Sequence, residues 1–315
     1  MMANPKQSAL KKPRFIGGHR ACAGCGYPIL LKQILSSTDD TIVVTAATGC
    51  LEVSSTIFPF SAWAMPYMHN AFENAAANSS GIEGAYQSLK KQGKMTKNVK
   101  FLAIGGDGGT YDIGIQSLSG AMERRHDMLY VCYNNDAYMN TGIQRSSATP
   151  LGANTTTSPA GKVEFGKKQH QKNLTEIMVA HEIPYVAQTA VAYWMDSTKK
   201  FEKAWSIHGP KFINAYTPCV LGWGYHMSQT VKISRIAVET NLWPLYEVEN
   251  GIYTITLKNP KEKRKPIEEF LKLQTRFKHL LNPSNKSVVE ELQNFIDKRY
   301  ERLELMEKAT NKNAN

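Results

Sequence analysis

One glycine turn and one asparagine pair contain the side chains of this sequence best suited to bind a metal ion. Asp107 lies between two pairs of glycines in the turn 105–109, and Asn135 follows later in the chain. Glycines beside an acid let the backbone approach a phosphate closely. Asp107 and Asn135 supply a carboxylate and an amide oxygen, and the Ala137 carbonyl can complete a set of three oxygens of the kind that Mg²⁺ prefers. The chemistry indicated is the binding of a diphosphate bridged by magnesium.

A strand, a helix and a second strand must position these groups. The apolar run Val99–Ile104 predicts a strand that enters the glycine turn, and Met128–Tyr133 predicts a strand that ends at the asparagine pair. The helix between them is expected to place Ile113, Leu118 and Met122 on one side. In such a βαβ unit both polar tips lie at the carboxyl edge of one parallel sheet, and the amides at the start of the helix face a bound anion.

Cysteines are the second group of residues that could do chemistry. The chain has five, an odd number, which favours metal or cluster ligation over disulfides in a protein expected to be cytoplasmic. Cys22 and Cys25 form a CxxC step directly before a predicted helix, Pro28–Leu35. A thioredoxin-like dithiol does not fit, because no strand precedes the motif and small residues crowd it. Half of a zinc site and half of an iron–sulfur site both remain open.

Two further cysteines follow predicted strands and therefore belong to the same sheet edge. Cys50 comes after the strand Thr41–Ala47, and Cys219 after the strand Lys211–Tyr216. Four thiolates from one turn and two strand ends could thus converge. Cys132 differs, because it lies inside an apolar strand and is expected to act as a small buried hydrophobe.

The spacing of the glycine–aspartate–glycine turn and the asparagine pair resembles the signature of thiamine diphosphate enzymes. With the cysteine pattern, the chain resembles the β subunit of the multi-subunit 2-oxoacid:ferredoxin oxidoreductases, closest to the pyruvate:ferredoxin type, with oxalate oxidoreductase a near relative. The resemblance implies thiamine diphosphate and Mg²⁺, with Asp107, Asn135 and Ala137 as metal ligands. It also implies a 4Fe–4S cluster close to the thiamine ring. Its expected ligands are Cys22, Cys25, Cys50 and Cys219.

The motifs and the resemblance together give a set of cofactor-binding positions, to which Glu52 is added because it is close to Cys50 in the chain. These are Gly49, Cys50, Glu52, Gly106, Asp107, Gly108, Gly109, Asn135, Ala137, Asn140 and Thr141. Asn140 is the expected catalytic residue, as an amide that faces thiamine and substrate. The helix-borne acids Glu73 and Glu83 and the neighbouring His69 are interpreted as polar residues of a subunit contact.

The expected activity is incomplete without partners. Thiamine activation needs a glutamate at the aminopyrimidine ring, and no glutamate here lies in a recognisable pyrimidine-binding motif. The resemblance assigns that residue to a pyrimidine-domain α subunit, and further clusters to a ferredoxin-like subunit. The implied reaction is oxidative decarboxylation of a small 2-oxoacid such as pyruvate, or cleavage of oxalate. Electrons pass through the 4Fe–4S cluster to ferredoxin, and the cofactor is the electron sink. The sequence does not decide between pyruvate and oxalate.

Two alternatives from other classes stay open. One is a thiamine diphosphate decarboxylase without redox function, in which the cysteines hold a structural zinc ion. The other is a non-catalytic electron-transfer subunit whose glycine turn is vestigial.

Composition sets further bounds. The 315 residues are 42% hydrophobic and 21% charged, no apolar run reaches the ~18 residues of a membrane span, and no apolar core follows the basic N-terminus. We therefore expect a cytoplasmic protein without a membrane segment. The net charge is +11, and residues 258–315 contain 14 Lys or Arg against nine Asp or Glu. This excess indicates a solvated helical face or a docking surface for an acidic partner or another subunit. No motif supports nucleic-acid binding.

The predicted fold is an α/β doubly wound, mostly parallel sheet of the thiamine diphosphate-binding type. We divide it into an N-terminal arm (1–18), a cofactor- and cluster-binding domain (19–225) and a helical C-terminal extension (226–315). The remaining expected elements follow in chain order: an aromatic and proline-rich loop at 58–66, a helix at 71–90, a long polar segment to 172, a helix ending at 181, a strand at 185–189, a helix at 194–207, a helix at 228–239, a strand pair at 242–257 that turns at Gly251, and helices at 267–273 and 288–306 before a fraying end at 308–315.

Overall fold

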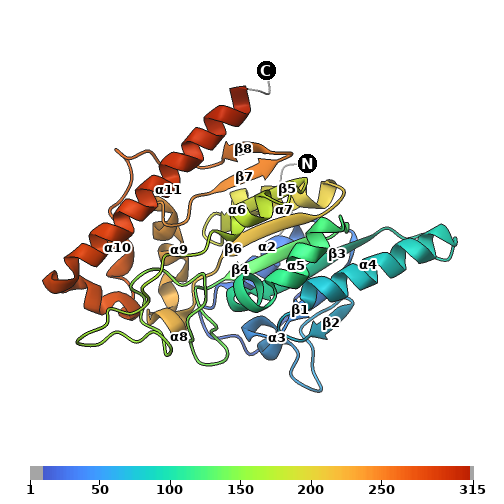
Figure 1. Ribbon diagram of the computed structural model, residues 1–315. Helices are drawn as coiled ribbons and strands as arrows, with labels where there is room; N and C mark the ends of the chain where they lie inside the picture. Colours follow the sequence, from blue (N-terminus) through green and yellow to red (C-terminus); the bar gives the residue numbers. More distant parts are fainter. Residues whose placement is uncertain (1–9, 313–315) are drawn as a thin grey trace.

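A single eight-stranded sheet forms the centre of the computed structural model, which describes residues 10–312 (Figure 1). The strand order is β2-β1-β3-β4-β6-β5-β7-β8. The first six strands in this order are parallel, and β7 and β8 complete the sheet as an antiparallel pair. The strands are β1 (Thr41–Ala47), β2 (Tyr67–Asn70), β3 (Val99–Gly106), β4 (Leu129–Asn134), β5 (Tyr185–Ala190), β6 (Lys211–Tyr216), β7 (Tyr246–Glu249) and β8 (Ile252–Ile255). The predicted fold class is confirmed.

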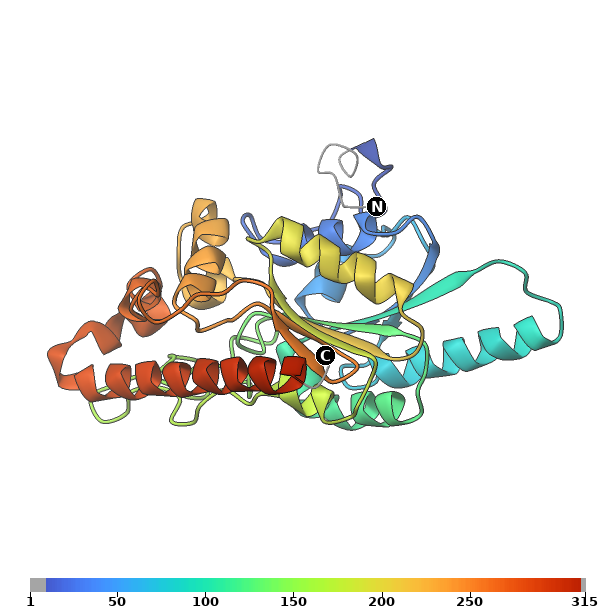
Figure 2. The same ribbon diagram turned by 90° about the horizontal axis from the view of Figure 1, so that it is seen from above.

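Helices cover both faces of the sheet, as Figure 2 shows from above. One face packs against α2 (Tyr27–Ser36), α3 (Cys50–Ser55) and α7 (Trp194–Ser206), and the other against α4 (Ala75–Lys91), α5 (Ile115–Glu123) and α6 (Leu174–Val179). In β3, Leu102 and Ile104 enter the first core, and Phe101 and Ala103 the second. A strand buried on both faces reads as a continuous apolar run, which is why β3 is recognisable in the sequence.

The C-terminal residues add a third apolar core beside the sheet. The helices of these C-terminal residues are α8 (Val220–Trp223), η2 (Met227–Gln229), α9 (Thr230–Glu239), α10 (Glu268–Leu271), η3 (Thr275–Leu281), η4 (Pro283–Asn285) and α11 (Lys286–Lys312). All of them except η2 and η4 contribute residues to this core. Trp223, Trp243 and Phe270 are fully or almost fully buried there. The long polar segment has no regular helix or strand between 135 and 173, yet Leu151 and Ala153 are buried in this same core. The segment is therefore a folded part of the molecule.

Most predicted element bounds agree with the structure to within a few residues, and β1 and β6 agree at both ends. Three expectations were wrong. Ile113 does not share the buried side of Leu118 and Met122 but is half exposed, because residues 108–113 form a π-helix (η1) whose turn is wider than that of the α-helix. The edge strand β2 was missed, since it has only four residues.

The third wrong expectation concerns the end of the chain. Fraying was predicted from residue 308, but α11 continues to Lys312. Its last turns are held on β8, because Thr310 accepts a hydrogen bond from the Tyr253 amide at 3.1 Å and Asn311 donates one to the Tyr253 carbonyl at 3.0 Å. Residues 313–315, and residues 1–9 of the predicted arm, lie outside the described part of the chain. Within that part, Phe15 is buried against Trp63.

Candidate functional site

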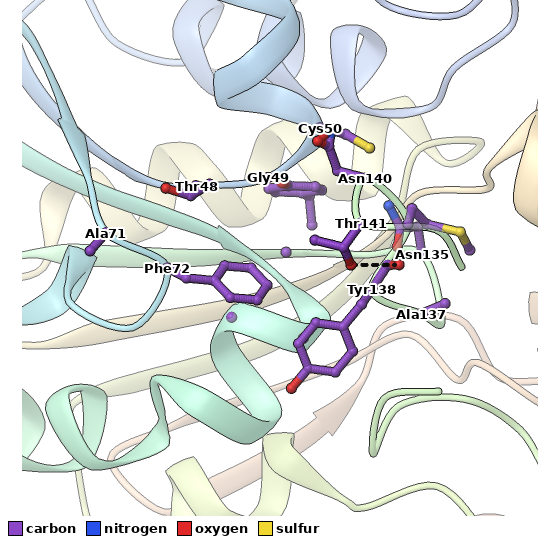
Figure 3. Close-up of a pocket in the computed structure, with 15 residues that line it drawn as sticks. Thr48, Gly49, Cys50, Ala71, Phe72, Asn135, Ala137, Tyr138, Asn140 and Thr141 are labelled. Atoms are coloured by element: carbon purple, nitrogen blue, oxygen red, sulfur yellow. Dashed lines mark hydrogen bonds between the residues drawn. The ribbon is translucent and has the colours of Figure 1, made fainter. Parts of the chain in front are cut away.

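A pocket of about 240 Å³ opens at the carboxyl ends of β1, β3 and β4 (Figure 3). Register explains the meeting of these strand ends, because Gly106 of β3 pairs with Tyr133 of β4, so that Asp107 and Asn134 follow side by side. The rings of Phe72 and Tyr138 lie 5.5 Å apart at the pocket wall. Nine of the predicted cofactor-binding residues line the pocket: Gly49, Cys50, Gly106, Gly108, Gly109, Asn135, Ala137, Asn140 and Thr141.

Asp107 lies beneath the pocket and is fully buried. Its Oδ1 accepts a hydrogen bond from the Asn135 amide at 3.1 Å, and its Oδ2 accepts one from Ser146 Oγ at 2.5 Å. Burial raises the pKa of Asp107 to about 8, against these two hydrogen bonds, which lower it. A bound cation would favour the ionised carboxylate at this position.

The Asn135 side chain presents one amide atom to two oxygens. This atom lies 2.9 Å from Asp107 Oδ1 and 3.0 Å from the Ala137 carbonyl oxygen. With nitrogen there, the amide donates to both oxygens. With oxygen there, three oxygens face one another and need a cation between them. The donor set therefore fits Mg²⁺ and matches the three ligands predicted from the sequence.

Glycine is required by close packing next to Asp107. A Cβ on Gly108 would overlap the ring of Tyr138, and one on Gly109 would lie 3.1 Å from the Phe72 carbonyl oxygen. A Cβ on Gly49 would come within 2.7 Å of the Tyr133 hydroxyl. The backbone at these positions thus forms the pocket floor directly, and any side chain would displace the aromatic wall.

The four predicted cluster cysteines gather beside this pocket from three separate segments. Cys22 and Cys25 form a turn closed by a hydrogen bond from the Cys25 amide to the Cys22 carbonyl at 3.0 Å. The next amide, of Gly26, donates to the Pro218 carbonyl at 3.2 Å, which ties the turn to the strand end that holds Cys219. Cys50 begins α3 and lines the pocket.

The pKa values of these thiols show that they lie within electrostatic range of one another. The pKa of Cys25 is raised to about 12, mainly by burial, and the charges of Cys219, Cys50 and Cys22 contribute to this rise. Burial likewise raises the pKa of Cys50 to about 12, with Cys219 and Cys22 adding to it. Gathered thiolates without a cation destabilise one another, so this group fits a positively charged centre.

Cys219 has a local hydrogen-bond donor as well. Its Sγ accepts a hydrogen bond from the Gly222 amide at 3.3 Å. In residues 10–312, no three His, Cys, Asp or Glu side chains are arranged as ligands of a single metal ion. Cys132, in contrast, is fully buried in β4 within the second apolar core.

Three predicted residues differ in how the structure places them. Asn140 and Thr141 line the pocket, and Thr141 Oγ1 donates to Gln144 Oε1 at 2.5 Å. Glu52 does not line it. Its Oε1 lies 3.0 Å from His69 Nδ1 and accepts a hydrogen bond from Thr56 at 3.0 Å, so the structure does not bring Glu52 together with the other cofactor residues.

Sequence reasoning missed four residues that hold the site in place. Ser146 bonds Asp107 from the long polar segment. Asp136, which lies between the predicted ligands Asn135 and Ala137, is fully buried and forms an ion pair with Arg276. Trp223 Nε1 donates a hydrogen bond to the Asn135 carbonyl at 2.8 Å. The only signal in the sequence was Asp136 itself, an acid directly after the Asn134-Asn135 pair. No local pattern indicated that Arg276 would be its partner.

Residues 47–215 match the family described as thiamine pyrophosphate enzyme, C-terminal TPP binding domain. This match covers more than half of the chain and assigns it to the thiamine pyrophosphate enzymes. Pyruvate synthase subunit PorB of Thermotoga maritima is 52% identical over 299 residues, which cover 93% of this chain and 92% of that protein. Subunit PorB of Methanocaldococcus jannaschii is 52% identical over 287 residues, covering 90% and 94%.

A third relative is ketoisovalerate oxidoreductase subunit VorB of Pyrococcus abyssi, 45% identical over 289 residues that cover 92% of each chain. Among solved structures, a 2-oxoglutarate:ferredoxin oxidoreductase from Magnetococcus marinus shares the fold, with a TM-score of 0.54, 22% identity, and coverage of 65% of this chain and 66% of that one. The chain therefore belongs to the β subunits of the 2-oxoacid:ferredoxin oxidoreductases, which are oxidoreductases that act with partner subunits. The predicted family is confirmed.

Among the helices of residues 10–312, none combines the length and the apolarity that a membrane crossing requires. The cytoplasmic location stays a prediction.

Proposed function

We propose that the chain is the β subunit of a pyruvate:ferredoxin oxidoreductase, which decarboxylates pyruvate oxidatively and passes the electrons through a 4Fe–4S cluster to ferredoxin. The observation that carries the proposal is the convergence of Asp107, Asn135 and Ala137 beneath a pocket that Cys50 also lines. Relatives at 52% identity are named for pyruvate, and one at 45% for ketoisovalerate. These names favour pyruvate, and they give no support to oxalate, the other substrate expected from the sequence.

The oxygens of Asp107, Asn135 and Ala137, called the oxygen set below, would hold Mg²⁺. They would leave the other octahedral positions to phosphate oxygens and water. Gly108 and Gly109 would let the diphosphate lie close to the backbone. When bound, thiamine diphosphate supplies the electron sink for the loss of CO₂. The amide of Asn140, on the pocket wall, would orient the substrate by hydrogen bonds, and the rings of Phe72 and Tyr138 would exclude water.

The four thiols would hold the cluster, with Cys22, Cys25, Cys50 and Cys219 as ligands. The mutual proximity of the four thiols and the partial burial of Cys25, Cys50 and Cys219 support this assignment. The Gly222 amide directed at Cys219 supports it as well, since hydrogen bonds to sulfur adjust cluster potentials. Cys50 would connect the two halves, because it lines the pocket and would bind the cluster. Cys50 would thus offer a direct path for electrons from the pocket to the cluster.

A partner α subunit would complete the active site. Among the described residues that line the pocket, none is Asp or Glu, so the glutamate that activates thiamine would come from that subunit. A ferredoxin-like subunit would receive the electrons from the cluster. The names of the relatives, each a subunit, support a complex.

The test is an anaerobic assay of the complex purified with its partner subunits. We expect pyruvate-dependent reduction of ferredoxin that requires coenzyme A, thiamine diphosphate and Mg²⁺, with much slower turnover of ketoisovalerate and oxalate. Metal analysis of the same preparation should give iron at the level of one cluster per β chain beyond the clusters of the partners.

Two results would replace the proposal. Zinc in place of iron, with CO₂ release but no ferredoxin reduction, would establish the non-redox decarboxylase. Full iron content without Mg²⁺-dependent thiamine diphosphate binding would establish the electron-transfer subunit with a vestigial glycine turn.

A further inference from the structure

We infer that Arg276, in the C-terminal extension, is a positioning residue of the cofactor site. Together with Asp136 it holds the turn that presents the Asn135 amide and the Ala137 carbonyl to Mg²⁺. This inference deepens the proposed function and rests on the magnesium site proposed there.

The turn contains a residue in a backbone conformation that is uncommon outside glycine, although Asp and Asn adopt it more often than most residues. Asp136 lies directly between the two proposed ligands and has a φ of 66°, in the left-handed region that few non-glycine residues adopt. Such a conformation persists when its surroundings fix it. Here the Asp136 amide donates to Asn134 Oδ1 at 3.0 Å, and its carbonyl accepts from Thr149 Oγ1 at 2.6 Å.

The side chain of Asp136 is fixed from the other end of the chain. Its Oδ2 accepts a hydrogen bond from Arg276 at 3.0 Å and one from the Tyr216 hydroxyl at 2.7 Å. Asp136 is fully buried, and Arg276 is 4% exposed. The charge of Arg276 therefore acts on the turn without screening by solvent.

The same guanidinium also fixes the other flank of the turn. It lies 4.0 Å from the ring centre of Trp223, whose Nε1 donates to the Asn135 carbonyl at 2.8 Å. Arg276 itself is held by Gln274, whose Oε1 accepts from Nε at 2.8 Å. The Arg276 guanidinium thus fixes Asp136 directly and Asn135 through Trp223. These are the two residues joined by the peptide bond at the centre of the turn.

Stability alone gives no reason for this arrangement. A buried ion pair is weak evidence for a stabilising role, since apolar residues of similar volume often serve as well. A pair attached to the residue between two metal ligands, however, sets where those ligands lie, and groups behind the ligands govern metal affinity. Arg264 offers a matched control, because it pairs with Asp297 at 2.7 Å inside the same extension. In the described part of the chain, Arg264 does not line the pocket and has no hydrogen bond or ion pair with a residue that does.

The experiment measures the Mg²⁺ concentration that half-saturates thiamine diphosphate binding to the purified, cofactor-depleted complex. We expect Arg276→Met to raise it about 10- to 100-fold, and Arg276→Lys to raise it less. Iron content should not change in either variant. Arg264→Met should lower the Tm and leave the Mg²⁺ requirement at the wild-type value.

A double variant separates positioning from folding. Asp136→Asn with Arg276→Met removes both charges of the buried pair together, and asparagine tolerates the left-handed backbone. We expect its Tm to recover towards wild type while its Mg²⁺ requirement stays raised. A wild-type requirement in the double variant would overturn the inference, whether or not Arg276→Met alone folds. Failure of the wild-type complex to bind the cofactor with Mg²⁺ would instead contradict the proposed function.

Discussion

The oxygen set and the four thiols of Cys22, Cys25, Cys50 and Cys219, called the thiol set, meet at one pocket. The two sets are brought together in different ways. Asp107, Asn135 and Ala137 come from one βαβ unit, and fixed register between β3 and β4 brings them together. The thiols come from the turn at Cys22–Cys25, the start of α3 and the end of β6, and Cys22 is exposed. A local unit sets the first group, whereas the whole fold sets the second.

This difference implies that each half can be removed without the other. The oxygen set is buried and held by hydrogen bonds within the protein, as the bonds of Asp107 to Asn135 and Ser146 show. The thiols have few such partners and raise one another's pKa, so their arrangement should depend on what they bind. Substitutions in one set should leave the cofactor of the other in place.

The largest effect is expected for Asp107→Asn, which keeps the shape of the side chain and removes the charge at the metal. We expect Mg²⁺ affinity to fall by more than about 100-fold, and activity at ordinary Mg²⁺ concentrations to be lost. Iron content should be that of the wild type. Asp127→Asn is the control, because Asp127 pairs with Lys211 at the opposite edge of the sheet. If iron falls together with Mg²⁺ affinity, the two sets are not independent.

Cys219→Ser should disrupt the thiol set and leave the oxygen set intact. We expect the loss of one cluster's iron and at least about a ten-fold drop in pyruvate-dependent dye reduction, since the thiolate ligand is gone. Thiamine diphosphate binding, measured by fluorescence titration, should persist.

Cys132→Ser is the matched cysteine control. The iron content should stay unchanged, and the free energy of unfolding should fall by about 1–3 kcal/mol, because a hydroxyl enters the apolar core. Equal iron loss in the two serine variants would refute the choice of cluster ligands.

A smaller effect is expected for Gly108→Ala, because the added methyl overlaps the ring of Tyr138 at the pocket wall. The concentration of thiamine diphosphate for half-saturation should rise about ten-fold, as expected for a small displacement of positioning groups. Gly84→Ala in α4 is the control, since a Cβ there meets no atom within 4 Å. That variant should gain ~0.5–1 kcal/mol in the free energy of unfolding by helix propensity. An unchanged half-saturation in Gly108→Ala would show that Tyr138 does not shape the cofactor site.

The same contrast explains how much the sequence could predict. Strands β1 and β6 were predicted at both ends because they are apolar runs bounded by turns. Asp107, Asn135 and Ala137 were predicted as one group because they follow β3 and β4, two neighbouring parallel strands whose ends lie side by side. Cys50 and Cys219 were placed after strand ends correctly, and their possible convergence with Cys22 and Cys25 was inferred from that placement. The choice of a 4Fe–4S cluster over zinc followed only from the family resemblance.

What could not be predicted depends on contacts across the whole chain. Arg276 meets Asp136 from a position 140 residues away, and no local pattern marks either residue as a partner. Ile113 was misplaced because the sequence carries no sign of the π-helix before α5. Glu52 was taken from its nearness to Cys50 in the chain, yet the first turn of α3 directs it to His69.

The most direct test of the central claim, that the oxygen set and the thiol set are two halves of one redox site, is electron paramagnetic resonance of the complex after anaerobic addition of pyruvate. In the wild type we predict the signal of a reduced 4Fe–4S cluster, only when thiamine diphosphate and Mg²⁺ are bound. Asp107→Asn should contain the same iron and give no signal, and Cys219→Ser should lack this cluster's signal. A wild-type signal from Asp107→Asn without bound cofactor, or from Cys219→Ser, would contradict the account.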